Sequence, residues 1–376
     1  MKSANNPFII SGYEGSEYFC DRVQETAQLS KEIANGNNVT MIAPRRMGKS
    51  GLIEHYFSQP DIMERYYTFF IDIYDTISMG ELIQKLSREI LMRLKPYGRR
   101  VLQQFWDTMR SLQPGISFSP TGEPSFNVQI GDIQSADTTL DEIFRYLESA
   151  DKPCIVAVDE FQQISKYSEK NIEAKLRTYV QHCHNAQFIF SGSQRHIMSE
   201  MFTSASRPFY QSVSMMHLES INPAVYDAFA RELFSKGERT LAEGVTEQVY
   251  QISQGVTWFT QKMFNTLYAN TPVCETCTVD QVPAALDYII KTQAYSYEET
   301  LFRLPEKQKT VLIALAKNGA TKGITSGAFI RQYRLTSASA VQAAVKGLLE
   351  KDFITCEKGV YSVYDLFMAE WLRRER

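Results

Sequence analysis

The 376-residue sequence lacks a strong charge of either sign, because 40 Lys and Arg stand against 43 Asp and Glu. A chain-wide basic surface for nucleic acid is therefore excluded. It also lacks any uncharged apolar run of about 18 residues, the length that a membrane helix needs. The first ten residues, MKSANNPFII, contain no apolar segment of signal-peptide length. We therefore expect a cytoplasmic protein with no membrane partner.

Cysteine is scarce, and its spacing gives no disulfide framework. Four of the six Cys are scattered and are expected to be free thiols in a reducing compartment. The other two form a C-x-x-C pair, Cys274 and Cys277, without a second pair. Zinc requires four ligands, so a metal site there is only a minor alternative to chance spacing.

Strand-like and helix-like segments alternate through the first 220 residues or so, which predicts an α/β domain over residues 1–218 with a parallel sheet. The strand-like segments are apolar runs, as expected for strands buried on both faces. Between them, Glu81–Leu94 has an amphipathic helical pattern. The Pro-containing stretch Gln113–Ala136 is expected to be an exposed excursion or a hairpin. The four apolar runs are Val39–Ala43, Tyr66–Tyr74, Cys154–Val158 and Phe188–Phe190.

The strand signal disappears after about residue 218, and helical patterns predict an all-helical unit over residues 219–295. These helices are expected at Pro223–Gly237, Thr246–Ser253, Thr257–Ala269 and Asp280–Lys291.

Residues 296–376 show three helical patterns and then two short strands around Lys358-Gly359, which is the order of a winged helix. Ser337 is the expected N-cap of the third helix. The three helices are expected at Glu306–Lys317, Gly327–Gln332 and Ser337–Glu350.

A phosphate-binding loop is predicted directly after the first strand, where APRRMGKS precedes a helix at Gly51–Phe57. The full pattern is G-x-x-x-x-G-K-[ST], and only its first Gly is replaced, by Ala43. That replacement is tolerable if Ala43 has a negative φ. Backbone N–H groups of such a loop surround phosphates, while Lys49 reaches the terminal phosphates and Ser50 supplies a hydroxyl to Mg²⁺. The predicted nucleotide contacts are Ala43, Pro44, Arg45, Arg46, Met47, Gly48, Lys49, Ser50 and Gly51.

Two adjacent acids end the buried strand CIVAV, about 110 residues after the loop. Ligands of open α/β sheets bind at this carboxyl edge. Asp159 is expected to hold Mg²⁺, directly or through water, and Glu160 to orient and deprotonate the attacking water. The loop and the acids together predict ATP or ADP as ligand and ATP hydrolysis as the activity.

A third strand, FIF, leads into Ser191-Gly192-Ser193. A polar residue at the tip of a neighbouring strand can contact the γ-phosphate or the attacking water. Ser193 is the first candidate and Ser191 the second, and an ordinary strand-to-helix turn with a Ser cap fits equally well.

The chain resembles the archaeal-type P-loop ATPases of the AAA+ class, in the branch of the STAND ATPases and the Orc/Cdc6 initiators. The similar segments span nearly the whole sequence. They are Asn6–Phe8, Phe19–Glu25 (an F-x-x-R-x-x-E box), the APRRMGKS loop, Ala157–Ile164, Phe190–Met198, Arg207–Tyr210 and Gly255–Trp258.

The resemblance implies a sheet in the order 5-1-4-3-2, a helical lid and a C-terminal winged helix. It also implies that the N-terminal box lies beside the adenine, which makes Phe8 and Arg22 candidate nucleotide contacts. For Arg22, a surface salt bridge with Glu25 is the alternative. Relatives carry an Arg after the Tyr of a P-L-Y-G-R segment, whereas here Gln211 and Ser212 follow, so Arg207 is the nearest candidate for a catalytic arginine.

Three functions fit these observations. The first is an ATPase that switches the positions of core, lid and winged helix for a protein partner, in which an arginine from a neighbour would require an oligomer. The second is ATP-controlled DNA binding through residues 296–376, which carry 13 Lys and Arg against 9 Asp and Glu. The third is a hydrolysis-poor, nucleotide-stabilised interaction protein.

Overall fold

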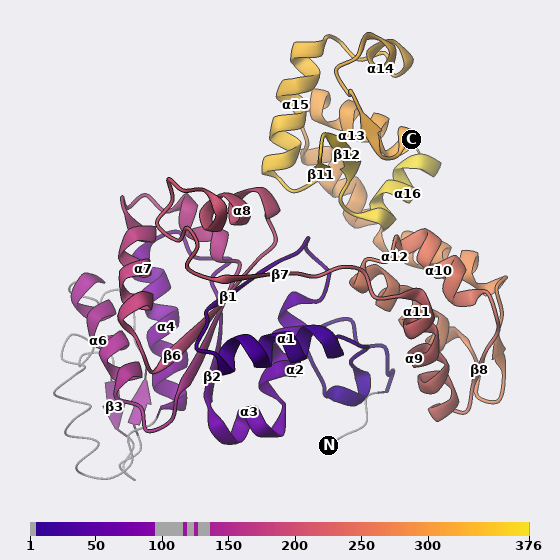
Figure 1. Cartoon of the computed structure of the whole chain (residues 1–376). Coiled ribbons are helices and arrows are strands. Elements are labelled where there is room, and N and C mark those ends of the chain that lie inside the picture. Colours follow the sequence, from indigo (N-terminus) through magenta and orange to yellow (C-terminus); the bar gives the residue numbers. More distant parts are fainter. Residues whose placement is uncertain (1–4, 95–115, 119–123, 127–135, 376) are drawn as a thin grey trace. The chain divides into compact units, whose positions relative to one another are not determined.

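The structure is a computed structural model that describes residues 5–94, 116–118, 124–126 and 136–375 (Figure 1). It divides into two compact units. We call Ser11–Ile221 the sheet unit, and Met1–Ile10 with Asn222–Arg376 the helical unit. In the helices of the described residues we find no segment both long and apolar enough to cross a bilayer.

A five-stranded parallel sheet forms the centre of the sheet unit, in the order β2-β5-β6-β1-β7. Numbered within the sheet alone, this is 2-3-4-1-5, so the predicted order is confirmed. The fifth strand comes from a segment to which the sequence patterns gave no bounds. The strands are β1 (Val39–Ile42), β2 (Tyr67–Asp72), β5 (Cys154–Asp159), β6 (Ala186–Gly192) and β7 (Ser214–His217).

Helices cover both faces of this sheet (Figure 1). The chain moves across the sheet in one direction after β1 and in the other direction after β2, and right-handed crossovers then place the connecting helices on opposite faces. One face carries α1 (Val23–Ala34), α2 (Lys49–Phe57) and α3 (Pro60–Arg65). The other carries α4 (Met79–Arg93), α6 (Ala136–Glu148), α7 (Ile172–His182) and α8 (Arg195–Thr203).

The core beneath the second set of helices is aromatic. Phe161 and Phe190 lie with ring centroids 4.4 Å apart, and Phe209 meets both rings edge-on. Phe161 belongs to the 3₁₀ segment η4 (Phe161–Lys166), which directly follows the predicted acids. Burial of this ring therefore fixes the chain where it leaves β5.

The predicted helix at Glu81–Leu94 begins two residues earlier, at Met79. Ser78 caps it by accepting a hydrogen bond from the N–H of Glu81, whose carboxylate accepts one from the N–H of Ile77. Of the stretch Gln113–Ala136, the described residues show an antiparallel pair of β3 (Ile116–Phe118) and β4 (Pro124–Phe126), and Ala136 begins α6. The remaining residues of this stretch lie outside the described residues.

The helical unit begins with α9 (Pro223–Lys236), α10 (Val245–Ser253), α11 (Thr257–Asn270) and α12 (Gln281–Arg303). Two short strands, β8 (Thr240–Leu241) and β9 (Thr276–Cys277), pair between them. The predicted end of the last helix at Lys291 is wrong, because α12 continues to Arg303. No Gly or Pro interrupts residues 292–303, Tyr297 and Leu301 continue its buried face, and Pro305 follows its end.

A winged-helix arrangement follows, with three helices and a three-stranded sheet in the order β10-β12-β11. Ser337 caps α15 as predicted, since its hydroxyl accepts a hydrogen bond from the N–H of Ala340. A final helix that the sequence patterns did not show, α16, closes the chain. The elements are α13 (Glu306–Asn318), β10 (Thr321–Lys322), α14 (Gly327–Gln332), α15 (Ala338–Glu350), β11 (Ile354–Glu357), β12 (Val360–Val363) and α16 (Leu366–Glu375).

Phe8 joins the N-terminal segment to the helical unit. Its side chain has no exposed surface, and its ring stacks on Phe264 at 5.4 Å between centroids. Its backbone carbonyl accepts a hydrogen bond from the side chain of Asn265. Phe8 is thus a core residue of the helical unit.

We predict that Phe8→Ala destabilises the helical unit by about 3–5 kcal/mol, because it removes a fully buried aromatic ring. Chemical unfolding of the full chain, followed by tryptophan fluorescence, measures the shift in midpoint. Val273→Ala, at a side chain that is 51% exposed, is the matched control and should leave the midpoint unchanged. Equal midpoints for the two variants would contradict the assigned packing.

Candidate nucleotide and metal site

The phosphate-binding loop leaves the carboxyl end of β1 and enters α2 at Lys49. Gly48 has φ 89°, a conformation that favours glycine, and Arg46 has φ 67°. Ala43 is not among the residues with positive φ, so the replacement of the usual Gly is tolerated as expected. The loop thus has the backbone shape that turns N–H groups toward an anion at the start of a helix.

Lys49 is held inside the loop rather than in solvent. Its side chain is 5% exposed, and Nζ donates hydrogen bonds to the carbonyl oxygens of Ala43 at 2.9 Å and Pro44 at 3.1 Å. Burial lowers the pKa of Lys49, while the nearby carboxylates of Glu160 and Asp159 favour its charged form. A buried ammonium bound mainly by neutral carbonyls is suited to an anionic partner.

The loop and the first predicted acid are in direct contact. The Ser50 hydroxyl donates a 2.6 Å hydrogen bond to Asp159 Oδ2, across 109 residues of sequence. Ser191, on the neighbouring strand β6, donates to the other oxygen of Asp159. A hydroxyl and a carboxylate meeting at this distance form the hard oxygen pair that Mg²⁺ prefers.

Glu160 is held in a conformation that non-glycine residues seldom adopt, with φ 56°. The Ser193 hydroxyl donates to Glu160 Oε2 at 2.7 Å, and the side-chain amide of Gln162 donates to the same oxygen. Ser193 and Gln162 also contact each other at 3.4 Å. Backbone strain held in place by side chains is typical of functional positions.

The two serines at the tip of β6 therefore contact different acids. Ser193, the first candidate, contacts Glu160, and Ser191, the second, contacts Asp159. The register of the sheet explains why each serine contacts a different acid. Val158 pairs with Phe190, so β5 and β6 end side by side.

Two further carboxylates lie close to these acids. Burial, with a smaller contribution from Asp159, raises the pKa of Glu54 on α2. Asp72 pairs with Asp159 across the two neighbouring strands. Burial is the largest cause that raises the pKa of Asp72, and the charges of Asp159 and Glu160 raise it further. A cation bound between Ser50 and Asp159 would relieve this accumulation of negative charge.

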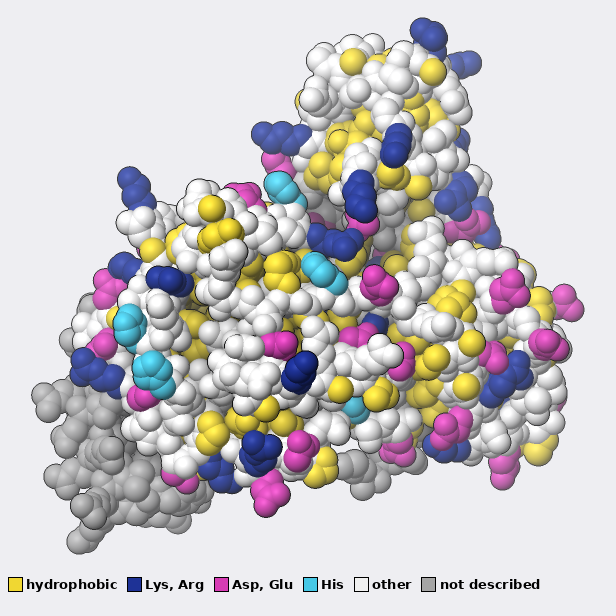
Figure 2. Space-filling model, viewed as in Figure 1, with side chains coloured by type: hydrophobic (Ala, Val, Ile, Leu, Met, Phe, Trp, Pro, Cys, Tyr) yellow, Lys and Arg dark blue, Asp and Glu magenta, His cyan; other side chains and the backbone are white. Residues whose placement is uncertain are grey.

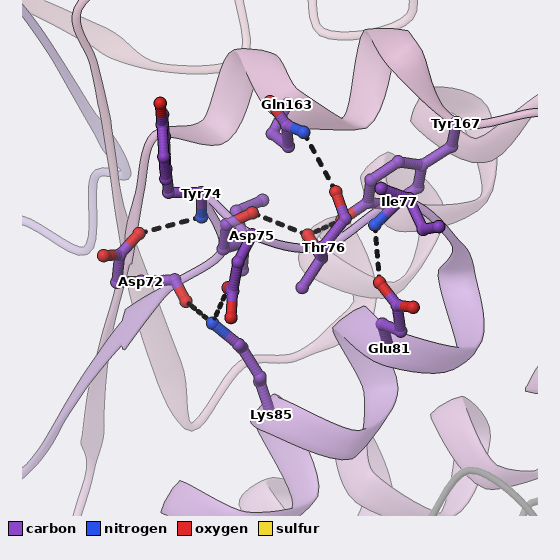
Figure 3. A network of polar contacts seen from close by, with 10 residues as sticks. Asp72, Tyr74, Asp75, Thr76, Ile77, Glu81, Lys85, Gln163 and Tyr167 are labelled. Carbon is purple, nitrogen blue, oxygen red and sulfur yellow. Dashed lines mark hydrogen bonds and ion pairs between the residues drawn. The ribbon is translucent and has the colours of Figure 1, made fainter. Parts of the chain in front are cut away.

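A polar network fixes the loop after β2 and connects it to the segment after Glu160 (Figure 3). The Gln163 amide donates to the Thr76 carbonyl at 3.0 Å, and the hydroxyls of Thr76 and Tyr167 are hydrogen-bonded. Lys85 reaches from α4 to the carbonyl of Asp72 at 2.6 Å and to the carboxylate of Asp75. The nucleotide loop also faces this segment, because the Arg45 guanidinium lies 5.2 Å from the ring centroid of Tyr74.

Arg22 is a buried residue that contacts the phosphate-binding loop. It is 3% exposed, and its guanidinium donates to Glu25, to the Met47 carbonyl at 3.4 Å and to the Glu219 carbonyl at 2.8 Å. The Glu25 pair named as the alternative is present at 2.6 Å, with the Arg22 side chain buried and that of Glu25 partly exposed.

Arg207 lies in a separate ion-pair group. It contacts Glu173 on α7 and Glu200 on α8, the latter at 3.2 Å. Within the described residues its side-chain contacts are these two carboxylates, and it does not join the group of Lys49, Ser50 and the two acids.

Gln162 is a site residue that the sequence reading did not identify. It is 2% exposed, and among the residues that the structure describes its Oε1 has no hydrogen-bond partner. A Cβ added to Gly192 would overlap this oxygen and the sulfur of Met198. Glutamine is an ordinary residue in sequence, so only its burial beside Glu160 shows its importance.

The C-x-x-C pair does not gather further ligands in the described part of the chain, where no three His, Cys, Asp or Glu lie together as a metal site. Cys277 is buried and Cys274 is exposed.

We predict that Gly192→Ala destabilises the sheet unit by about 1–3 kcal/mol, because the added methyl forces Gln162 and Met198 to move. Gly51→Ala is the control, since among the described residues a Cβ there meets Phe19 at 3.6 Å, an ordinary contact. Urea unfolding of both variants decides the matter. An equal midpoint for Gly192→Ala and the wild type would show that Gln162 is not confined as described.

Comparisons with known proteins agree with this architecture. Residues 295–374 match the family described as a probable winged helix domain. No curated protein matches the chain in sequence.

Solved structures of similar fold cover nearly the whole chain. A Walker-type ATPase of Pyrococcus abyssi is 18% identical, with TM-score 0.67, covering 98% of this chain and 99% of its own. The ORC2 protein of Aeropyrum pernix, in ADPNP–ADP complexes, is 12% identical, with TM-score 0.60, covering 99% and 96%. The ORC1 protein of Aeropyrum pernix, in complex with DNA, is 10% identical, with TM-score 0.56, covering 99% and 97%.

At these identities the similarity establishes the fold. The chain therefore has the P-loop fold of these Walker-type and Orc-like ATPases, with a winged-helix domain at its C-terminal end.

Proposed function

We propose that the chain binds ATP with Mg²⁺ at the loop of residues 43–51 and hydrolyses it to ADP and phosphate. One observation carries this proposal, the 2.6 Å hydrogen bond that joins Ser50 of the loop to Asp159 at the strand end. It brings the phosphate-binding loop and the two acids to one place, as the reaction requires. The similar folds of a Walker-type ATPase and of a protein solved with ADPNP and ADP support the choice of nucleotide.

The loop would hold the phosphates mainly through its backbone. Its N–H groups and the N-terminus of α2 provide donors and a favourable dipole for an anion. Lys49 would exchange its bonds to the Ala43 and Pro44 carbonyls for phosphate oxygens. Because Lys49 is already buried in the loop, little further ordering is needed when the substrate binds.

Ser50 and Asp159 would hold Mg²⁺, which neutralises phosphate charge when it is bound. Both side chains are already in contact, and Ser191 supports Asp159 from the adjacent strand.

Glu160 is our candidate for the general base. Ser193 and Gln162 both donate to its Oε2, which leaves Oε1 to orient a water molecule and accept its proton. Ser193 would also contact the γ-phosphate, so that substrate binding and the position of the base are linked. We give Arg207 no role in this mechanism, since its side chain pairs with Glu173 and Glu200.

We further propose that the bound nucleotide controls the arrangement of three functional parts, residues 1–218, 219–295 and 296–376. The last two share one compact unit, and α12 runs without interruption from one into the other. Trp258 and Phe259 of α11 also pack on Phe367 of α16. The lid and the winged helix would therefore move as one body for a protein partner, with chain connections at residues 10–11 and 221–222 as the joints.

We predict that Lys49→Ala weakens ATP binding at least about tenfold, because a hydrogen bond to a charged group is worth about 1.5–3 kcal/mol. Glu160→Gln is the matched variant. It should retain ATP binding but lose turnover by about 10²–10⁴-fold, because only the general base is removed. Isothermal titration and a phosphate-release assay measure the two quantities.

Unchanged ATP affinity in Lys49→Ala would overturn the site. Equal, very slow turnover in the wild type and Glu160→Gln would instead favour the hydrolysis-poor, nucleotide-stabilised interaction protein.

DNA binding through the winged helix is a second candidate function. The charged side chains on the visible face of this domain are mostly basic (Figure 2), and α15 exposes Gln342 and Lys346. A similar fold has been solved with DNA. Phosphate contacts through such residues would make binding strongly salt-dependent.

We predict that, if this function holds, the full chain shifts duplex DNA at low salt and Lys346→Glu weakens the complex about tenfold, since it replaces a phosphate contact by repulsion. Lys262→Glu on α11 is the control. A gel-shift series in salt, with and without ATP, measures this. Absence of any shift at low salt would remove DNA as a partner.

A further inference from the structure

Three large aromatic side chains stand exposed in a row on α12. Tyr288, Tyr295 and Phe302 are 57%, 76% and 81% exposed. Positions seven apart lie on the same side of an α-helix, so the three rings form one stripe, about 21 Å long at 1.5 Å per residue. We call this the α12 stripe.

The same helix buries a different face inside the helical unit. Ile289, Tyr297 and Leu301 are buried, and Tyr297 packs on Trp371 of α16 with ring centroids 5.6 Å apart. The helix is therefore already anchored on one face, and the stripe is not needed to hold it in place. Exposed apolar stripes of this size are typical of contact surfaces.

The α12 stripe can pack against a second copy of itself if the two helices run antiparallel and meet at Tyr295. Tyr288 and Phe302 are equally far from Tyr295, so two antiparallel copies of α12 would place each opposite the other. Lys291 and Glu299 are also equally far from it and carry opposite charges.

The next charged pair follows the same rule. Asp287 and Arg303 are equally far from Tyr295 and are opposite in sign. Asp287 also accepts a hydrogen bond from Arg374, and Arg303 lies 3.7 Å from Glu299 of its own helix.

We propose that a second copy of this chain packs on the α12 stripe, giving a two-fold symmetric dimer with antiparallel α12 helices. A two-fold contact requires a surface that complements itself. The aromatic stripe and the pairs Lys291–Glu299 and Asp287–Arg303 meet this requirement, and Glu298 lies opposite the uncharged Thr292. An unrelated partner would not require the charges to mirror about Tyr295. One helix against one helix is a small interface, so we expect a weak dimer with a dissociation constant of about micromolar or above.

Reversing one charge of the Lys291–Glu299 pair in the full chain tests the proposed dimer. Lys291→Glu alone would place two Glu opposite each other, and Glu299→Lys alone would place two Lys opposite each other. Sedimentation velocity over a concentration series should show each single variant dimerising about tenfold or more weakly than the wild type. An equimolar mixture of the two should recover dimers, because every opposed pair is then of opposite sign.

Lys358→Glu, on the exposed turn between β11 and β12, is the control for a change of net charge and should leave dimerisation unchanged. A wild type that stays at 43.1 kDa at every concentration would overturn the proposal. A mixture no more associated than either variant alone would overturn it as well.

A second measurement places the two-fold axis. In a background with the exposed Cys274 and Cys356 changed to Ser, Tyr295→Cys puts a thiol on the proposed axis, where two copies meet. Mild oxidation should give a covalent dimer. Gln293→Cys, exposed on another side of α12, is the control and should give far less. Equal yields from the two positions would reject the antiparallel contact. Neither test depends on nucleotide, so the outcome is separate from that of the proposed ATPase activity.

Discussion

The hydrogen bond between Ser50 and Asp159 is the contact on which the interpretation of this protein depends. It joins the helix that follows the first strand to the end of another strand 109 residues away. A carboxylate in that place is costly unless hydrogen-bond donors or a cation satisfy it, and two serines donate to it here. This contact brings the loop, the acids and the sheet edge together at the candidate site.

Much of the surrounding structure restrains that site. Arg22 binds the Met47 carbonyl beneath the loop, and Gln162 with Ser193 holds Glu160 in a strained backbone conformation. On the other side, Gln163 connects the segment after Glu160 to the loop after β2 (Figure 3). A site restrained from several directions is suited to electrostatic catalysis, which requires groups that do not have to reorganise.

The residues of the candidate site show which features could be predicted from the sequence and which could not. Lys49, Ser50, Asp159, Glu160 and Ser193 were all predicted from the sequence, since a glycine-lysine-serine turn and adjacent acids after apolar runs leave few alternatives. Gln162 and the buried position of Arg22 were not predicted, because the burial of a side chain depends on packing against distant parts of the chain and leaves no local signal. Phe8 and Arg207 were predicted as site residues, yet the structure places one in a core and the other among Glu173 and Glu200.

The sequence by itself determined the alternation of strands and helices, the phosphate-binding loop and the winged-helix order, because period, caps and turns are local properties. The strand order followed from a resemblance and not from spacing. Only the tertiary structure decided which serine serves which acid, that α12 continues past Lys291, and that three aromatic rings on it remain exposed. These outcomes depend on packing between residues far apart in the chain, and local patterns carry no information about such distances.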